Sequence, residues 1–225
     1  MPHHTYRQDL MGSASVEPSG SFEAGTWHSF TVTYTCGKFG IDDRGNIKMC
    51  FRGHADQTKL QFDDPKAPGY TTVEASTGIP IELAFEHRRN TRPWNYSLLI
   101  RCNRYLTEGD TLTICIGDPS QGSPGIRLQT MVEPTFEFQI IADPFACYDF
   151  IPLLPENQAT INVVSGPAVS WKAILPTLRR AGEPFRLCLK SEDVWGNPGE
   201  SGTETVKLEA VGPLKGLPET IAIPK

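Results

Sequence analysis

Apolar and polar residues alternate in a series of short stretches along the first two thirds of the chain. The clearest stretch spans residues 28–36, where Phe30, Val32, Tyr34 and Cys36 occupy every second position and threonines stand between them. Since successive side chains of a β-strand point to opposite faces, this pattern predicts a strand with one buried face. Similar runs, separated by Gly, Pro, Asn and Asp, follow at residues 46–52, 71–75, 81–85, 97–102, 111–116, 127–132 and 136–141.

The regular spacing of these runs predicts an all-β fold, in which an antiparallel β-sandwich comes first. Each strand offers only one apolar face, so a second sheet must cover it. The chain also contains 20 glycines and 19 prolines, and this punctuation leaves little room for long helices. We expect one core, formed by Phe30, Val32, Tyr34, Met49, Phe51, Leu112, Ile114 and Phe138.

The same pattern divides the chain into four segments. Residues 1–13 are predicted to be a flexible N-terminus, and residues 14–148 the sandwich. Prolines at positions 152, 155 and 167 favour an extended connector over residues 149–169. Residues 170–225 then form a second, smaller β domain.

The second domain resembles the early strands of bacterial immunoglobulin-like domains. Strands are expected to begin near Ser170, Pro184 and Thr205, and a Gly-Asn-Pro turn follows at residues 196–198. A complete immunoglobulin-like domain needs about seven strands and about 100 residues, so we predict a partial one. Its open edge should be covered by the first domain, by a second copy or by a partner chain, which would bury Trp171, Leu187 and Leu208.

Charge, cysteine content and the N-terminus limit the function classes. A net charge of −5 without blocks of like charge argues against nucleic acid and anionic membranes as partners. The six cysteines are widely spaced, which favours free thiols over a zinc or disulfide framework. The first residues lack the apolar run of a signal peptide, and no segment is long and apolar enough for a membrane span, so a cytoplasmic location is expected.

Five segments carry a resemblance that spans nearly the whole chain. They are residues 22–27, 40–47, 61–65, 117–130 and 175–180, and together they resemble the N-terminal region of the bacterial family called domain of unknown function 3604. Longer members of that family carry a downstream metal-dependent domain similar to the PHP phosphoesterases. The His- and Asp-rich motifs of that domain do not occur here. The resemblance therefore implies an accessory region or subunit, and it transfers no catalytic residue.

A loop rich in arginine and aromatic residues is the first candidate contact surface. It runs from residue 87 to residue 96, and its side chains suit an anion, a carboxylate ligand or an acidic partner surface. A polar hairpin loop anchored by its tryptophan is the simpler interpretation. With a second glycine-rich loop at 117–127, the candidate binding residues are Arg89, Arg92, Trp94, Tyr96 and Arg127.

Paired acids at 42–43 and at 63–64 allow calcium binding in principle, but turn chemistry at strand ends is favoured. No histidine or cysteine has metal-ligand spacing, and no serine stands in a nucleophile motif. The sequence therefore names no catalytic residue, metal or cofactor.

Three functions remain as hypotheses. The first is a non-catalytic accessory or assembly module of a metal-dependent hydrolase-like domain or subunit, acting as a homo-oligomer or with a separate catalytic chain. The alternative is a stand-alone module that binds a small anionic or sugar-like ligand through residues 87–96. An enzyme in its own right ranks last, because it would need Asp63, His87 and Arg127 to converge from separate loops.

Overall fold

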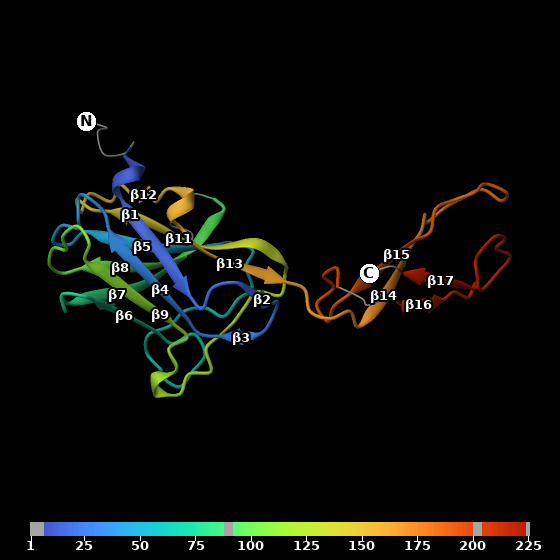
Figure 1. Ribbon diagram of the computed structural model, residues 1–225, viewed down its shortest axis with the longest axis horizontal. Helices are drawn as coiled ribbons and strands as arrows, with labels where there is room; N and C mark the ends of the chain where they lie inside the picture. Colours follow the sequence, from blue (N-terminus) through green and yellow to red (C-terminus); the bar gives the residue numbers. More distant parts are fainter. Residues whose placement is uncertain (1–6, 88–91, 200–203, 224–225) are drawn as a thin grey trace. The chain divides into compact units, whose positions relative to one another are not determined.

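Strands make up nearly all the regular structure of the computed structural model, which describes residues 7–87, 92–199 and 204–223 (Figure 1). The helices within these ranges are three short 3₁₀ turns at Gln8–Leu10 (η1), Pro119–Gln121 (η2) and Pro155–Asn157 (η3). The expected all-β class is confirmed. The chain divides into two units, Met1–Val164 (unit 1) and Ser165–Lys225 (unit 2).

Unit 1 contains two main sheets. The first has the order β1-β4-β9-β6 and is antiparallel throughout. Its strands are β1 (Gly12–Glu17), β4 (Phe30–Cys36), β9 (Thr111–Ile116) and β6 (Thr71–Ala75). The second has the order β2-β13-β11-β5-β8-β7, with β12 paired to β11. Its strands are β2 (Ser21–Glu23), β13 (Ala159–Val164), β11 (Glu133–Asp143), β5 (Asn46–Arg52), β8 (Trp94–Cys102), β7 (Ile81–His87) and β12 (Ile151–Pro152).

A few pairings depart from the antiparallel plan. Strand β13 runs parallel to β2, so the second sheet is mixed. A small separate ladder joins β3 (Trp27–His28) to β10 (Ile126–Arg127). The predicted strand at 127–132 is therefore wrong in its bounds, because strand pairing stops at Arg127 and resumes only at Glu133.

The inner faces of the two sheets meet in a single hydrophobic core. All eight predicted core residues belong to it, and each is at most 2% exposed. Phe138 lies near the middle, with its ring centroid 5.5 Å from that of Phe30, 6.0 Å from that of Phe51 and 5.3 Å from that of Phe136. Aromatic side chains from β4, β5 and β11 thus join the two sheets.

Two predicted boundaries of the sandwich are wrong. Residues 149–169 were expected to be a connector, but β13 within them alternates buried Ala159, Ile161 and Val163 with exposed neighbours and pairs with both β2 and β11. The prolines of residues 149–169 do not prevent formation of β13, because Pro155 begins a 3₁₀ turn ahead of the strand. At the other end, Met11 is 2% exposed and β1 begins at Gly12, so the described part of residues 1–13 contributes to the fold.

Unit 2 is a small β domain made of two antiparallel ladders. Strand β14 (Ser170–Ile174) pairs with β15 (Cys188–Glu192), and β16 (Glu204–Lys207) pairs with β17 (Thr220–Ile223). The expected strand near Pro184 begins only at Cys188, and Phe185 is exposed. Strand pairing over the described residues is thus less extensive than in a full immunoglobulin-like domain.

A buried aspartate organises the turn that follows β15. The carboxylate of Asp193 accepts hydrogen bonds from the backbone N–H groups of Gly166, Trp195 and Asn197 and from the side-chain amide of Asn197, at 2.9 to 3.1 Å. Burial alone would raise the pKa of Asp193, but these hydrogen bonds outweigh burial and hold the pKa below its ordinary value. The ionised carboxylate is therefore part of the folded turn.

We expect the turn to lose protection when Asp193 is protonated. Because its folded pKa is lowered, the stabilisation is present above the ordinary pKa of 3.8 and is lost as pH falls through the lower folded value. Hydrogen-exchange protection factors of the Trp195 and Asn197 amides should fall about tenfold across this window. The Asp193→Asn variant should show no such step, and an identical step in that variant would refute the assignment.

Candidate functional site

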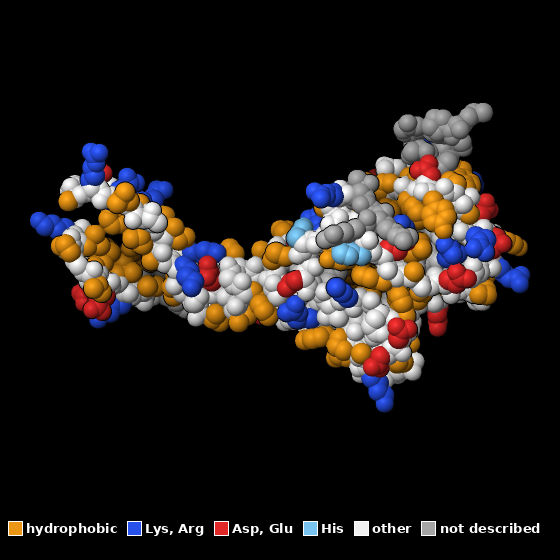
Figure 2. Space-filling view, turned by 180° about the vertical axis from the view of Figure 1, so that it is seen from behind, with side chains coloured by type: hydrophobic (Ala, Val, Ile, Leu, Met, Phe, Trp, Pro, Cys, Tyr) orange, Lys and Arg blue, Asp and Glu red, His pale blue; other side chains and the backbone are white. Residues whose placement is uncertain are grey.

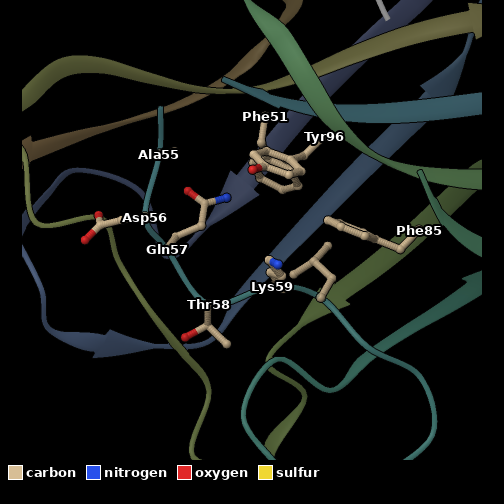
Figure 3. A pocket seen from close by; sticks show the side chains of 9 residues that line it. Phe51, Ala55, Asp56, Gln57, Thr58, Lys59, Phe85 and Tyr96 are labelled. Carbon is tan, nitrogen blue, oxygen red and sulfur yellow. The ribbon is translucent and has the colours of Figure 1, made fainter. Parts of the chain in front are cut away.

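A pocket of about 250 Å³ opens in unit 1 between the second sheet and the loop that follows β5 (Figure 3). Its sheet side is formed by Phe51 of β5, Phe85 of β7 and Tyr96 of β8. Its loop side is formed by residues 55–60. We call this site the end pocket. Tyr96 is one of the residues that the sequence proposed for binding.

The sheet side of the end pocket is a set of flat aromatic faces. Tyr96 stands opposite His87 in the β7–β8 ladder, and the two rings stack with centroids 4.8 Å apart and an angle of 9°. Phe85 stacks on the same tyrosine at 6.2 Å and 17°. Phe85 and Tyr96 are only partly buried and pack against the core, whereas Phe51 belongs to it.

The loop side supplies polar groups. In Figure 3 the amide nitrogen of Gln57 lies on the side of the Phe51 and Tyr96 rings, and the amide oxygen lies on the other side. That oxygen, Oε1, is buried and accepts no hydrogen bond from the described residues. Buried acceptors are nearly always satisfied, so an oxygen without a donor among the described residues is unusual. Lys59 is exposed at the same wall and forms no ion pair with the described residues.

A network behind the loop holds it in place. The Asp56 carboxylate accepts hydrogen bonds from the backbone N–H of Thr130 at 2.8 Å and from its hydroxyl at 3.0 Å. Arg127 donates to the backbone carbonyl of Asp56 at 2.9 Å and pairs with its carboxylate at 3.4 Å. In Figure 3 the Asp56 side chain points away from the cavity. The loop is thus fixed from outside the pocket, which leaves Gln57 and Lys59 at the wall.

The predicted binding residues therefore have different positions. Tyr96 lines the end pocket, and Arg127 supports its loop. Trp94 lies under the guanidinium of Arg52, 5.4 Å from the ring centroid, and is not part of the pocket wall. Arg92 is exposed, and Arg89 lies outside the described residues.

The convergence needed for the enzyme hypothesis is not seen. Arg127 pairs with Asp56, and the His87 ring stacks on Tyr96. The backbone N–H of Asp63 donates to Gln61. The contacts of these residues within the described part of the chain do not join them to one another.

The paired acids also have local partners. The side chain of Asp64 accepts a hydrogen bond from the backbone N–H of Lys66 at 2.9 Å, which is the Asx-type turn that the sequence favoured. Asp42 accepts through its backbone carbonyl from Gly45 in a tight turn. Within the described ranges, no three His, Cys, Asp or Glu side chains lie close enough to hold a metal ion.

The outer face of the second sheet carries a row of charged side chains. Lys48 pairs with Glu86 at 2.9 Å and lies 4.2 Å from the centroid of the Phe150 ring. Arg52 pairs with Glu133 at 2.6 Å. Between the two pairs lies the fully buried Cys50, and burial raises the pKa of its thiol to about 12. This thiol is therefore protonated at neutral pH and is a poor nucleophile.

Comparison with known proteins adds no functional assignment. A scan against protein-family models found no match, and a search of curated proteins also found none. Among the described residues, no helix has the length and apolar character that crossing a bilayer requires.

Sequence reasoning missed Gln57, Lys59 and Phe85 as pocket residues. Phe85 was recognised only as the last residue of the predicted strand at 81–85, and residues 53–60 match no known motif. No local signal marks these positions, because the pocket forms only when a long loop folds back on β7 and β8.

Proposed function

We propose that this chain is a non-catalytic β-sandwich module that assembles with another polypeptide through an apolar groove in unit 2. The observation that carries the proposal is this groove, a hollow of about 430 Å³. Figure 2 shows hydrophobic side chains gathered around it. Its apolar lining includes Leu175, Phe185, Leu187, Leu208, Val211 and Leu214.

The exposure of this lining is high for so small a domain. Leu175 is 51% exposed, Leu214 is 42% exposed and Val211 is fully exposed. Contiguous apolar surface of this kind marks interaction sites in soluble proteins. Two-stranded ladders are also only marginally stable alone, so contact with another chain would stabilise them.

The expected partner follows from the family resemblance. Longer members of the family that the chain resembles carry a metal-dependent hydrolase-like domain, and we propose that such a domain or subunit is the physiological partner. Unit 1 then serves as a rigid support. The proposal assigns no catalytic group to this chain.

Self-association of the isolated chain tests whether the groove is an interaction site. Without another partner, we expect the full chain to scatter light as a species larger than its 24.9 kDa monomer at concentrations of about 100 µM, because weak apolar interfaces associate in the micromolar range. Charges introduced by Leu175→Asp and Leu214→Asp should shift the species toward monomer.

A matched control is Leu178→Asp, since Leu178 is 86% exposed but lies outside the groove lining. It should leave the mass unchanged. A wild-type chain that stays monomeric at this concentration would contradict self-association through the groove.

A second candidate function is the binding of a small ligand in the end pocket. The observation that favours it is the cavity itself, which is lined by the partly buried rings of Phe85 and Tyr96 and by a loop that carries Gln57 and Lys59. Ligand sites typically combine an apolar lining with a few convergent polar groups. This function involves unit 1 alone and is compatible with assembly through unit 2.

A further inference from the structure

The polar groups that the end pocket offers to a ligand are hydrogen-bond donors. Lys59 lines the pocket, is exposed and forms no ion pair among the described residues. Figure 3 shows the amide nitrogen of Gln57 on the side of the Tyr96 ring, whose hydroxyl points toward the loop. Neither of these two groups donates a hydrogen bond to a described residue. One ammonium, one amide and one hydroxyl group therefore remain for a ligand.

The acidic residue of the lining does not oppose these donors. The Asp56 carboxylate accepts hydrogen bonds from Thr130 and pairs with Arg127, and its side chain points away from the cavity (Figure 3). The cavity thus presents donors and one positive charge, which is the chemistry that recognises an anion. A ligand carboxylate can accept from all three donors, because its two oxygens provide about four lone-pair sites.

The rest of the wall is apolar and limits the body of the ligand. Phe51 is 2% exposed, Leu60 is 4% exposed, and both belong to the hydrophobic core. The Tyr96 ring is stacked with both His87 and Phe85, so little of its faces remains for an aromatic ligand. The volume of about 250 Å³ lies just below the range of about 300 to 1,000 Å³ that is typical of small-molecule sites. A short aliphatic chain fits these limits.

We propose that the end pocket binds a short unbranched aliphatic carboxylate, an inference that rests on the second candidate function above. The carboxylate lies beside the Lys59 ammonium and accepts hydrogen bonds from the Gln57 amide and the Tyr96 hydroxyl. The chain extends along Phe51 and Leu60. The lining then follows the general plan of ligand sites, in which apolar contacts provide affinity and a few polar groups fix the orientation.

The test is a titration of the isotope-labelled full chain with sodium acetate, butanoate and hexanoate, and with 1-hexanol and hexylammonium chloride, followed through its amide resonances. We expect hexanoate to shift the amides of residues 55–60 and of Phe85 and Tyr96, with a dissociation constant on the order of 1 mM. The affinity should fall about fourfold for each methylene removed from the chain, because each buried methylene contributes to binding. 1-Hexanol should bind about tenfold more weakly than hexanoate, and hexylammonium should not bind.

Two variants assign the polar contacts. Lys59→Met should reduce the affinity for hexanoate to that for 1-hexanol, and Tyr96→Phe, which keeps the stacked ring, should weaken hexanoate about threefold. Lys66→Met is the matched control, since Lys66 is exposed in the same loop but does not line the pocket. Because Lys59 is exposed, its replacement should leave the fold and the reference spectrum intact.

The other outcomes separate this inference from the function on which it rests. If 1-hexanol or hexylammonium binds in the pocket as tightly as hexanoate, the carboxylate assignment is wrong but the ligand-binding function stands. If acetate binds as tightly as hexanoate, the aliphatic chain is wrong in the same way. If none of the compounds shifts the pocket amides, both the carboxylate assignment and the ligand-binding function fail.

Discussion

Replacement of Phe138 by alanine is expected to lower the free energy of unfolding of unit 1 by about 3 to 5 kcal/mol. The Phe138 side chain is fully buried and contacts the rings of Phe30, Phe51 and Phe136 from both sheets. Its removal forfeits the burial of a large apolar surface and leaves a cavity that a sandwich core closes only in part. Urea-induced unfolding, followed through the amide resonances of unit 1, measures the effect.

The control for this prediction is Tyr105→Ala. Tyr105 is 69% exposed, so its removal should change the free energy of unfolding by no more than about 0.5 kcal/mol. A loss below about 1 kcal/mol for Phe138→Ala would mean that the ring is not a central element of the core.

Alternation along single strands predicted the core of unit 1 well. In β4, the residues at every second position are buried and the threonines between them are half-buried. Strand β13 was not predicted, although Ala159, Ile161 and Val163 alternate clearly with exposed residues. There the neighbouring prolines outweighed the alternation in the interpretation, because a proline next to a short apolar run also fits a loop.

Strand β5 shows a limit of the same rule. Its polar positions, which include Lys48 and Cys50, alternate with the core residues, yet both are buried. Part of the cover comes from Phe150, whose ring lies over the Lys48 ammonium, and Phe150 follows β11 far along the chain. Alternation identifies the two faces of a strand, but it does not reveal which additional segments cover the outer face.

The end pocket was predictable only in part. Tyr96 could be proposed because an arginine-rich loop with aromatic residues is a recognisable local signal. Gln57 and Lys59 carry no such signal, and they reach the pocket only because Asp56 ties their loop to Arg127 and Thr130. Contacts between residues more than 70 positions apart depend on the tertiary fold, so they cannot be inferred from a single sequence.

The outer face of the second sheet leads to a further prediction. Arg52 lies between Trp94 and Glu133, and the nearby carboxyl group of Glu137 is half-buried. Burial raises the pKa of Glu137 above its ordinary value, Glu133 raises it further, and Arg52 opposes the rise. The positive charge of Arg52 thus offsets the repulsion between the carboxylates of Glu133 and Glu137 in the folded state.

We expect Arg52→Met to lower the free energy of unfolding by about 2 to 3 kcal/mol at pH 8, less than for a fully buried pair because the Arg52 side chain is 34% exposed. A group whose pKa is raised by folding binds its proton more tightly in the folded state, so stability increases as pH falls through the folded value. Without Arg52 the pKa of Glu137 rises further, and the loss caused by the substitution should therefore shrink as pH falls from 8 toward 5. Urea unfolding at several pH values measures this trend.

The control is Lys38→Met. Both partners of the Lys38–Glu108 pair are more than half exposed, so the change in the free energy of unfolding should be below about 1 kcal/mol at every pH. If the loss in Arg52→Met did not change with pH, the arginine would stabilise the sheet by packing on Trp94 and not by its charge.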